Sequence, residues 1–381
     1  MGSLKKYIVN VLGELVAIPS VNPPGNEKMI AERVSAFLEE SGIAASVDVI
    51  DGERANVVGL LRGEHPRPIL VLNGHLDTVP VKDNWDYPPF EATIENDRMF
   101  GLGAADMKGG IASMLGAAKV LAASNEKLKG TLMLTFVADE ERKNLGTLRF
   151  LENYRDIDYA VIGEPTNLHI VTTHRGVMRF RICTFGRAAH ASNPSHGENA
   201  IYKMNEVIHA CMSLEKRYHS VSSSYVQRPS LSITGIKGGT AENIVPDTCE
   251  IIIDRRTVPA ETAEEIEESF RTQLEEIKKK DKEFNYSLEI LTAVNAWKVR
   301  DDSVLLRYGI EAYGKCFGRN PELRDLGATC EATLFAQRGI DTIVFGPGNI
   351  LAAHTKNEFI RILQLEQAAE YYRTLTKEVL S

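Results

Sequence analysis

Residues 71–80 of the chain read Val71-Leu72-Asn73-Gly74-His75-Leu76-Asp77-Thr78-Val79-Pro80. The apolar run at the start of this stretch predicts a buried strand, and its end carries two side chains that can serve a metal ion. Because residues two apart on a strand lie on the same face, His75 and Asp77 should point to the same side. A metal-bound imidazole usually donates its second N–H to a carboxylate, and Asp77 can accept it. The stretch therefore predicts a metal ligand at the end of a buried strand.

Further metal-ligand candidates stand at the ends of other apolar runs, each beside glycine or proline. They are Asp106, the adjacent pair Glu140 and Glu141, Glu164, and His354. Divalent cations take carboxylate and imidazole ligands, and a two-metal site needs a carboxylate that bridges the ions. Asp106 lies among small residues that allow such a close approach. Since Glu140 and Glu141 are adjacent, they should face different ways, so one can bind metal while the other transfers protons.

Buried strands alternate with helices in the first part of the chain, which predicts an α/β layered domain with a mostly parallel sheet. After Gly176 the order becomes strand–helix–strand–strand–helix–strand, which is typical of a small α+β, ferredoxin-like sandwich. Alternation of helices and strands resumes from Ser303. We therefore expect an inserted lid and dimerisation domain at 177–291, within a catalytic zinc-binding domain formed by 1–176 and 292–381.

The composition argues against several classes of protein. The chain is 43% hydrophobic and 25% charged, which is ordinary for a soluble globular protein. Its net charge of −8 argues against a nucleic-acid or membrane-surface partner, because those surfaces attract positive charge. No stretch approaches the roughly 18 apolar residues of a membrane span. The five cysteines are scattered, which argues against a disulfide framework, so we expect a cytoplasmic protein.

Taken together and in order, these motifs resemble the dinuclear-zinc family that holds acetylornithine deacetylase, succinyl-diaminopimelate desuccinylase, aminoacylase and glutamate carboxypeptidase. The resemblance runs from about Ile18 to Glu358. The matching segments are Gly74–Pro80, Gly103–Gly110, Ala138–Glu141, Gly163–Thr166, Gly186–Ser192, Gly197–Ala200, Asn243–Pro246, Asp254–Arg256, and Gly346–Gly348 with His354. Each segment alone is a weak signal, whereas the ordered set is highly specific.

The resemblance implies which residues hold metal. Two Zn²⁺ ions would be bound, with Co²⁺ or Mn²⁺ as alternatives that the same oxygen-rich ligands tolerate. One ion would be held by His75 and Glu164 and the other by Glu141 and His354, with Asp106 as the bridge. Asp77 would orient His75. The family also carries a cis peptide bond after the bridging aspartate, which corresponds here to Asp106-Met107.

The resemblance also implies catalytic and substrate-binding residues. Glu140 would be the general base, taking a proton from a metal-bridging water and passing it to the leaving amine. His190 would reach the site from the partner's lid in a homodimer and stabilise the oxyanion. Asn243 and Arg256 would hold the carboxylate of the substrate, and a planar guanidinium suits bidentate capture of such a group.

Several functions remain open at this point. We favour a deacylase that removes the acyl group from a small N-acyl amino acid, as in amino-acid metabolism, similar to acetylornithine deacetylase or the desuccinylase. A di- or tripeptidase or a carboxypeptidase would use the same dinuclear site. A catalytically silent relative would be expected to lose Glu140 or a ligand, and the chain retains all of them. A nucleotide-binding protein is disfavoured because no phosphate-binding loop is present.

Three departures from the family pattern affect the expected pocket. Arg142-Lys143 follows Glu141 where the family often has a glycine-rich turn, and Thr329-Cys330-Glu331 stands where the family often has Thr-Asp. We interpret Cys330 as a small buried residue. Of the two adjacent arginines, we assign substrate binding to Arg256, because strand alternation sends Arg255 to the other face.

Overall fold

The computed structural model describes residues 2–82, 84–124, 127–220 and 228–381, and the chain forms two compact units. Unit 1 comprises Met1–Thr172, Val299–Arg324 and Cys330–Ser381, and unit 2 comprises Thr173–Lys298 and Asp325–Thr329. Unit 1 is therefore assembled from three separate stretches of sequence. The assignment of catalytic and lid roles to such domains stays a prediction.

Unit 1 is organised around a sheet whose strands follow the order β1-β2-β6-β3-β7-β17-β8. Its four central strands, β6, β3, β7 and β17, pair in parallel, whereas β1 and β2 are antiparallel. The strands are β1 (Ala44–Asp51), β2 (Arg54–Leu61), β3 (Ile69–His75), β6 (Thr131–Val137), β7 (Tyr159–Ile162), β8 (Ile170–His174) and β17 (Asp341–Val344). Every residue of β6 is buried, as expected for a parallel strand covered on both faces. The predicted α/β class with a mostly parallel sheet is confirmed.

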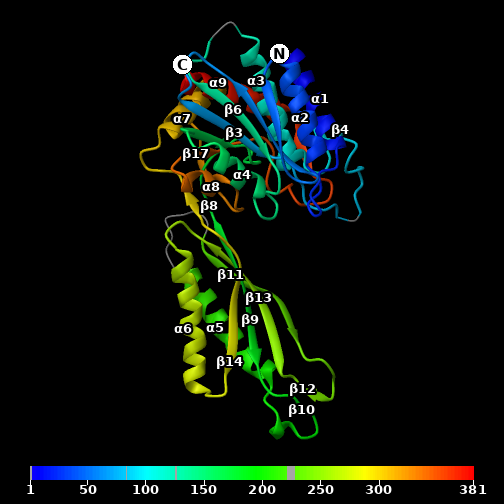
Figure 1. Ribbon diagram of the computed structural model, residues 1–381, viewed down its shortest axis with the longest axis vertical. Coiled ribbons are helices and arrows are strands. Elements are labelled where there is room, and N and C mark those ends of the chain that lie inside the picture. The colour runs from blue at the N-terminus through cyan, green and yellow to red at the C-terminus, as the bar shows by residue number, and fades with distance from the viewer. Residues whose placement is uncertain (1, 83, 125–126, 221–227) are drawn as a thin grey trace. The chain divides into compact units, whose positions relative to one another are not determined.

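Helices pack on this sheet, among them α3 on β3 and α4 on β2 and β6 (Figure 1). The helices of unit 1 are α1 (Gly2–Ala17), α2 (Lys28–Glu40), α3 (Gly109–Ala122), α4 (Leu145–Asn153), α7 (Val304–Phe317), α8 (Ala332–Gln337) and α9 (Ile362–Leu380). Helix α3 is buried along most of its length because it is rich in small residues. At Gly116, a Cβ atom would lie 2.6 Å from Ile8 Cγ1, so glycine allows α1 to pack closely against α3.

A smaller sheet in unit 1 has the strand order β18-β5-β4, with β4 (Thr93–Glu95), β5 (Arg98–Phe100) and β18 (Phe359–Arg361). All of its pairs are antiparallel, and Phe359 lies opposite Phe100. The strands are short and were not predicted. Their pairing brings the segment just before β18 against the segment just after β5, which matters for the metal centre.

Unit 2 contains a four-stranded antiparallel sheet with the order β11-β13-β9-β14, flanked by two helices. In chain order these strands are second, third, first and fourth, which is the ferredoxin-like arrangement. The elements of unit 2 are β9 (Gly176–Phe185), β10 (Ala189–His190), η2 (Pro194–His196), α5 (Ala200–Ser220), β11 (Ser230–Gly238), β12 (Ile244–Val245), β13 (Thr248–Thr257), α6 (Ala263–Lys280), β14 (Asn285–Val294) and β15 (Trp297–Lys298). Strand β16 (Leu323–Leu326) lies at the boundary between the two units in the sequence.

The core of unit 2 forms where apolar residues of the sheet meet one face of each helix. Helix α6 buries Ile266, Phe270 and Leu274, which stand four residues apart, and it begins with a capping box between Thr262 and Glu265. The Phe270 ring packs against Phe180 of β9, with ring centroids 4.6 Å apart. This core lies within unit 2, so unit 2 has its own apolar centre.

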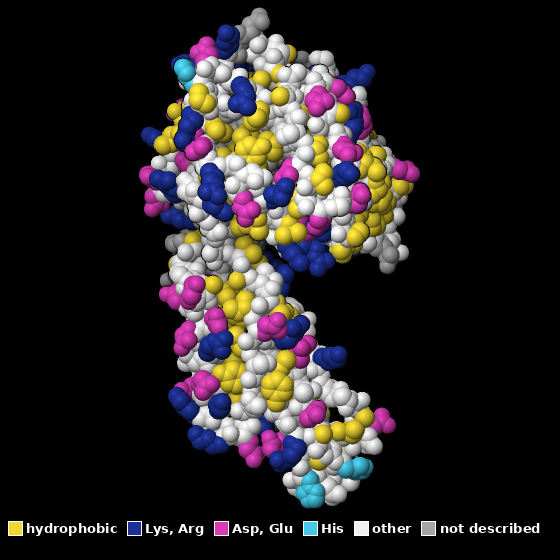
Figure 2. Space-filling model, in the orientation of Figure 1, with side chains coloured by type: hydrophobic (Ala, Val, Ile, Leu, Met, Phe, Trp, Pro, Cys, Tyr) yellow, Lys and Arg dark blue, Asp and Glu magenta, His cyan; other side chains and the backbone are white. Residues whose placement is uncertain are grey.

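The surface of each unit mixes charges of both signs on the face shown in Figure 2. Among the described residues, no helix is long and apolar enough to cross a membrane.

Candidate metal centre

The candidate ligands of unit 1 meet at one edge of the large sheet. Strands β3, β6, β7 and β17 are parallel, so their carboxyl ends share that edge. In open α/β sheets, ligands bind outside the carboxyl ends of the strands. His75 ends β3, Glu140 and Glu141 follow β6, and Glu164 follows β7. His354 lies in the loop between β17 and β18.

His75 and Asp106 form the buried centre of this site. His75 is only 1% exposed, and Asp106 lies in the irregular turn η1 (Ala104–Lys108). The distance between His75 Nε2 and Asp106 Oδ1 is 3.0 Å. The other ring nitrogen, Nδ1, lies 3.0 Å from the main-chain oxygen of Asp77 and 3.6 Å from its Oδ1. Contacts to Asp77 therefore hold the ring so that Nε2 faces Asp106.

His354 approaches the other oxygen of the same carboxylate. Its Nε2 lies 3.4 Å from Asp106 Oδ2 and 2.9 Å from Glu141 Oε1. Asp106 thus offers one oxygen to each of the two imidazoles, which is the arrangement that a bridging carboxylate requires. The peptide bond between Asp106 and Met107 is cis, as the family resemblance implied.

Glu140, Glu164 and Glu331 form a neighbouring acidic group, with one carboxylate oxygen of each within 4.8 Å of the others. Glu164 Oε1 lies 4.0 Å from His75 Nε2, so this group adjoins the histidine. Glu141 instead groups with His75 and Asp106. The adjacent side chains of Glu140 and Glu141 therefore face different groups.

The electrostatics of the centre suit cations. Burial raises the pKa of Glu140 well above its ordinary value, and the charge of Glu164 raises it further, against a lowering by His75. Burial likewise raises the pKa of Glu164, and the charge of Asp106 adds to the effect. Burial alone would lower the pKa of His75, but its hydrogen bond to Asp106 raises it well above the ordinary value. Two imidazoles among close, buried carboxylates fit a pair of divalent ions, which would offset the repulsion between the acids.

The carboxylate of Asp77 holds the loop that carries both glutamates. Its Oδ1 accepts a hydrogen bond from the backbone N–H of Glu140 at 3.0 Å, and its Oδ2 accepts one from Glu141 at 3.1 Å. Asn22 Nδ2 donates to Asp77 Oδ2 and to Asp139 Oδ1, each at 2.9 Å. The amide of Asn22 thus bridges two buried carboxylates at the base of this loop.

The remaining candidates, His190, Asn243 and Arg256, lie in unit 2. His190 on β10 lies opposite Ile244 of β12, and the main-chain oxygen of Asn243 accepts a hydrogen bond from the N–H of Ala191 at 2.9 Å. Arg256 lies near the end of β13, and its Nε donates to Asp254 Oδ1 at 2.7 Å. Unit 2 thus brings His190 and Asn243 together next to the start of β13 and leaves Arg256 near the other end of that strand.

The departures from the family pattern have different surroundings. Arg142 and Lys143 are exposed, whereas Cys330 is 3% exposed and so is a buried residue, as interpreted. Arg255 is fully buried and forms an ion pair with Glu261, while Arg256 is partly exposed. The predicted alternation of the two arginines is confirmed.

Three residues near the centre were missed as site candidates. Glu331 figured only in a departure from the family pattern, yet it is fully buried and accepts a hydrogen bond from Asn73 Nδ2 at 2.9 Å. Asn22 lies in a proline-rich turn and Glu358 just before a short strand, and neither has a periodic or spacing signal. Their partners are distant in sequence, so local patterns could not have identified them.

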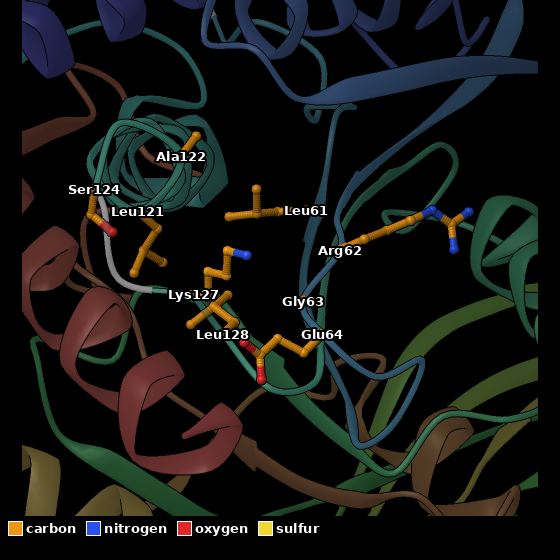
Figure 3. A pocket seen from close by; sticks show the side chains of 9 residues that line it. All are labelled: Leu61, Arg62, Gly63, Glu64, Leu121, Ala122, Ser124, Lys127 and Leu128. Carbon is orange, nitrogen blue, oxygen red and sulfur yellow. The ribbon is translucent and has the colours of Figure 1, made fainter.

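A separate cavity of about 360 Å³ lies in unit 1 between the end of β2, α3 and the segment before β6 (Figure 3). The side chains of Leu61, Leu121 and Leu128 line it, while Arg62 points away from it. Because Leu61 pairs with Leu132 near the start of β6, this cavity lies at the edge opposite the metal-ligand candidates. It is not part of the candidate centre.

Comparison with known proteins identifies the family. The model of peptidase family M20/M25/M40 matches residues 71–378. The acetylornithine deacetylase of Aliivibrio salmonicida is 32% identical over 353 residues, which cover 88% of this chain and 87% of that protein. The chain belongs to peptidase family M20/M25/M40. It is a hydrolase that acts on amide bonds.

Solved structures share the fold. A tripeptidase from Staphylococcus aureus has a TM-score of 0.81 and 20% sequence identity, covering 99% of this chain and 98% of its own. The YXEP protein of Bacillus subtilis, a dinuclear metal binding peptidase of the M20 family, has a TM-score of 0.78 and 18% identity, covering 100% of this chain and 99% of its own. At these identities the likeness concerns the fold alone.

Proposed function

We propose that this chain is a metal-dependent deacylase that hydrolyses the amide bond of a small N-acyl amino acid, with acetylornithine or a similar compound as the substrate type. The observation that carries the proposal is Asp106, whose two oxygens face the imidazoles of His75 and His354 beside a separate glutamate, Glu140. The similarity to acetylornithine deacetylase along most of the chain favours the deacylase over a peptidase.

In this proposal, five residues of unit 1 hold two divalent ions. One would be bound by His75 and Glu164 and the other by Glu141 and His354, with Asp106 shared. Zn²⁺ is the expected metal, and the same ligands accept Co²⁺ or Mn²⁺. When bound, such a pair polarises the amide carbonyl and lowers the pKa of water.

Of the two adjacent glutamates, Glu140 would be the general base. Its carboxylate groups with Glu164 and Glu331, whereas Glu141 groups with His75 and Asp106. Glu140 would accept a proton from the attacking water and donate it to the leaving amine. Burial raises the pKa of Glu140 well above its ordinary value, and the charge of Glu164 raises it further. Asp77 would fix its position through the backbone N–H.

Unit 2 would supply substrate contacts. Arg256 and Asn243 would hold the substrate carboxylate, and His190 would stabilise the oxyanion. Because His190 and Arg256 lie near different ends of β13, we propose that one active site draws on unit 2 of both copies in a homodimer. The five cysteines are free and dispersed, which supports a reducing, cytoplasmic location.

The proposal can be tested with two matched substrate panels, N-acyl amino acids and unblocked dipeptides, by quantifying the amine released by zinc-loaded protein. Glu140→Ala serves as the blank, and its metal content should equal that of the wild type because Glu140 is not a proposed ligand. Turnover confined to the acyl panel supports the deacylase. Turnover of dipeptides alone would instead identify the protein as a peptidase. Turnover that persists in Glu140→Ala would show that Glu140 is not the general base.

A further inference from the structure

Glu358 is a buried carboxylate outside the proposed ligand set, and it lies directly before β18. It is only 1% exposed. The pairing of β18 with β5 places Glu358 against the segment that follows β5, where its main-chain oxygen accepts a hydrogen bond from the N–H of Gly101 at 3.0 Å. The side chain is thereby directed along the turn that leads to Asp106.

Both carboxylate oxygens of Glu358 accept hydrogen bonds from the backbone of this turn. Oε2 accepts from the N–H of Gly103 at 3.0 Å. Oε1 accepts from the N–H of Ala105 at 2.9 Å and of Asp106 at 3.0 Å. Three backbone donors thus converge on one side chain.

The turn needs such an acceptor because it is not a regular helix. Asp106 has φ −121° and ψ 96°, and Met107 has φ −129° and ψ 34°, so the helical pattern of main-chain hydrogen bonds is interrupted there. Buried N–H groups without partners cost free energy. Only a carboxylate is an acceptor at both oxygens, whereas glutamine has one acceptor and one donor group.

One short segment therefore contacts Asp106 twice. His354 approaches the Asp106 side chain at Oδ2, and Glu358, four residues later, binds the Asp106 main chain. The segment can thus set the position of the carboxylate relative to both imidazoles. In the proposed function, Asp106 is the shared ligand, so a displacement of this one residue would disturb both ions.

We propose that Glu358 is a positioning residue that holds the turn Gly103–Asp106 and so prearranges Asp106 for metal binding. This inference rests on the proposed metal-dependent function. It predicts that a change at Glu358 weakens metal binding by the folded apoprotein, which a residue important only for stability would not do.

The test compares Glu358→Gln with Asp341→Asn. Asp341 is a matched control because its buried carboxylate accepts hydrogen bonds from Ser303 Oγ and from the N–H groups of Val304 and Leu305, at the edge of the sheet opposite the ligands. Each substitution replaces one oxygen by an NH₂ group that faces donors. Zn²⁺ affinity of the apoproteins is measured by competition with a chromogenic chelator, and apoprotein unfolding is followed in parallel.

We expect Glu358→Gln to lower Zn²⁺ affinity about tenfold to a hundredfold, the range typical of residues that support metal ligands, with Asp341→Asn unchanged. Glu358→Asp keeps the charge but has a shorter reach, so it should give a smaller loss and serves if Glu358→Gln does not fold. Wild-type affinity in both Glu358 variants, with reduced stability, would overturn the inference while leaving the proposed function intact. A wild-type protein that binds no metal would overturn both.

Discussion

Asp77 accepts a hydrogen bond from the backbone N–H of Glu140 at 3.0 Å, and its second oxygen accepts one from the next residue, Glu141. A single buried carboxylate therefore fixes the start of the loop that carries the proposed base and a proposed ligand. The same aspartate also holds the ring of His75. Asp77 thus contacts three residues of the candidate centre, namely His75, Glu140 and Glu141.

Replacing Asp77 by asparagine should reduce activity strongly. One of its oxygens becomes an NH₂ group that faces a backbone donor, and an unsatisfied buried donor costs about 1–3 kcal/mol. If that free energy is lost from the transition state, kcat/KM falls about tenfold to a hundredfold. The measurement is steady-state kinetics together with metal content. Asp48→Asn, which alters a partly exposed pair with Arg149, is the control, and equal kcat/KM in both variants would contradict the expectation.

Replacing Asn22 by alanine should lower stability. The Asn22 amide donates to both Asp77 and Asp139, and without it two buried carboxylates each lose a donor. We expect the free energy of unfolding to fall by about 1–3 kcal/mol, measured by urea titration. Asn10→Ala, on the exposed side of α1, should stay within about 0.5 kcal/mol of the wild type. A change at Asn22 no larger than at Asn10 would rule out the bridging role.

The free energy of unfolding should depend on pH because the buried carboxyl of Glu27 titrates with a raised pKa. Burial raises the pKa of this carboxyl from 4.5 to about 7, and the charge of Asp77 contributes. The folded protein therefore binds the proton more tightly than the unfolded chain, so the stabilisation is fully present below pH 4.5 and is lost as pH rises toward 7. Because one pKa unit corresponds to about 1.4 kcal/mol, the loss approaches about 3 kcal/mol.

Glu27→Gln removes this titration, so the variant should gain stability relative to the wild type between pH 5 and pH 8. Urea unfolding at several pH values measures the difference between the two proteins. A difference that stays constant over this range would show that Glu27 does not titrate with a raised pKa.

Mixing two inactive variants tests whether His190 acts across a dimer. Glu140→Ala keeps His190, and His190→Ala keeps Glu140, so a mixed dimer contains one site with both residues if His190 of the partner subunit completes it. Random assortment in a twofold dimer should restore about a quarter of wild-type activity after the subunits exchange. If both residues act within one chain, the mixture stays as inactive as its components.

The sequence predicted the parallel sheet and the ligand candidates because their signals are local. The buried strands are largely apolar runs, and His75, Glu141 and Glu164 each stand at the end of one or within four residues after it. The residues that hold these ligands gave no such signal. Asn22 and Glu358 act through hydrogen bonds to segments far away in sequence, and the short pairing of β18 with β5 that directs Glu358 depends on tertiary packing.

The order of the ligands along the chain affects how the protein is made. His354 stands 190 residues after Glu164 in the sequence, since all of unit 2 is encoded between them. At translation rates of about 5–20 residues per second, the ribosome needs about 10–40 s to cover that distance. Strand β17, which lies between β7 and β8, is also synthesised late. The nascent chain can complete the core of unit 2 first, whereas His354 can join the other proposed ligands only when synthesis is nearly finished.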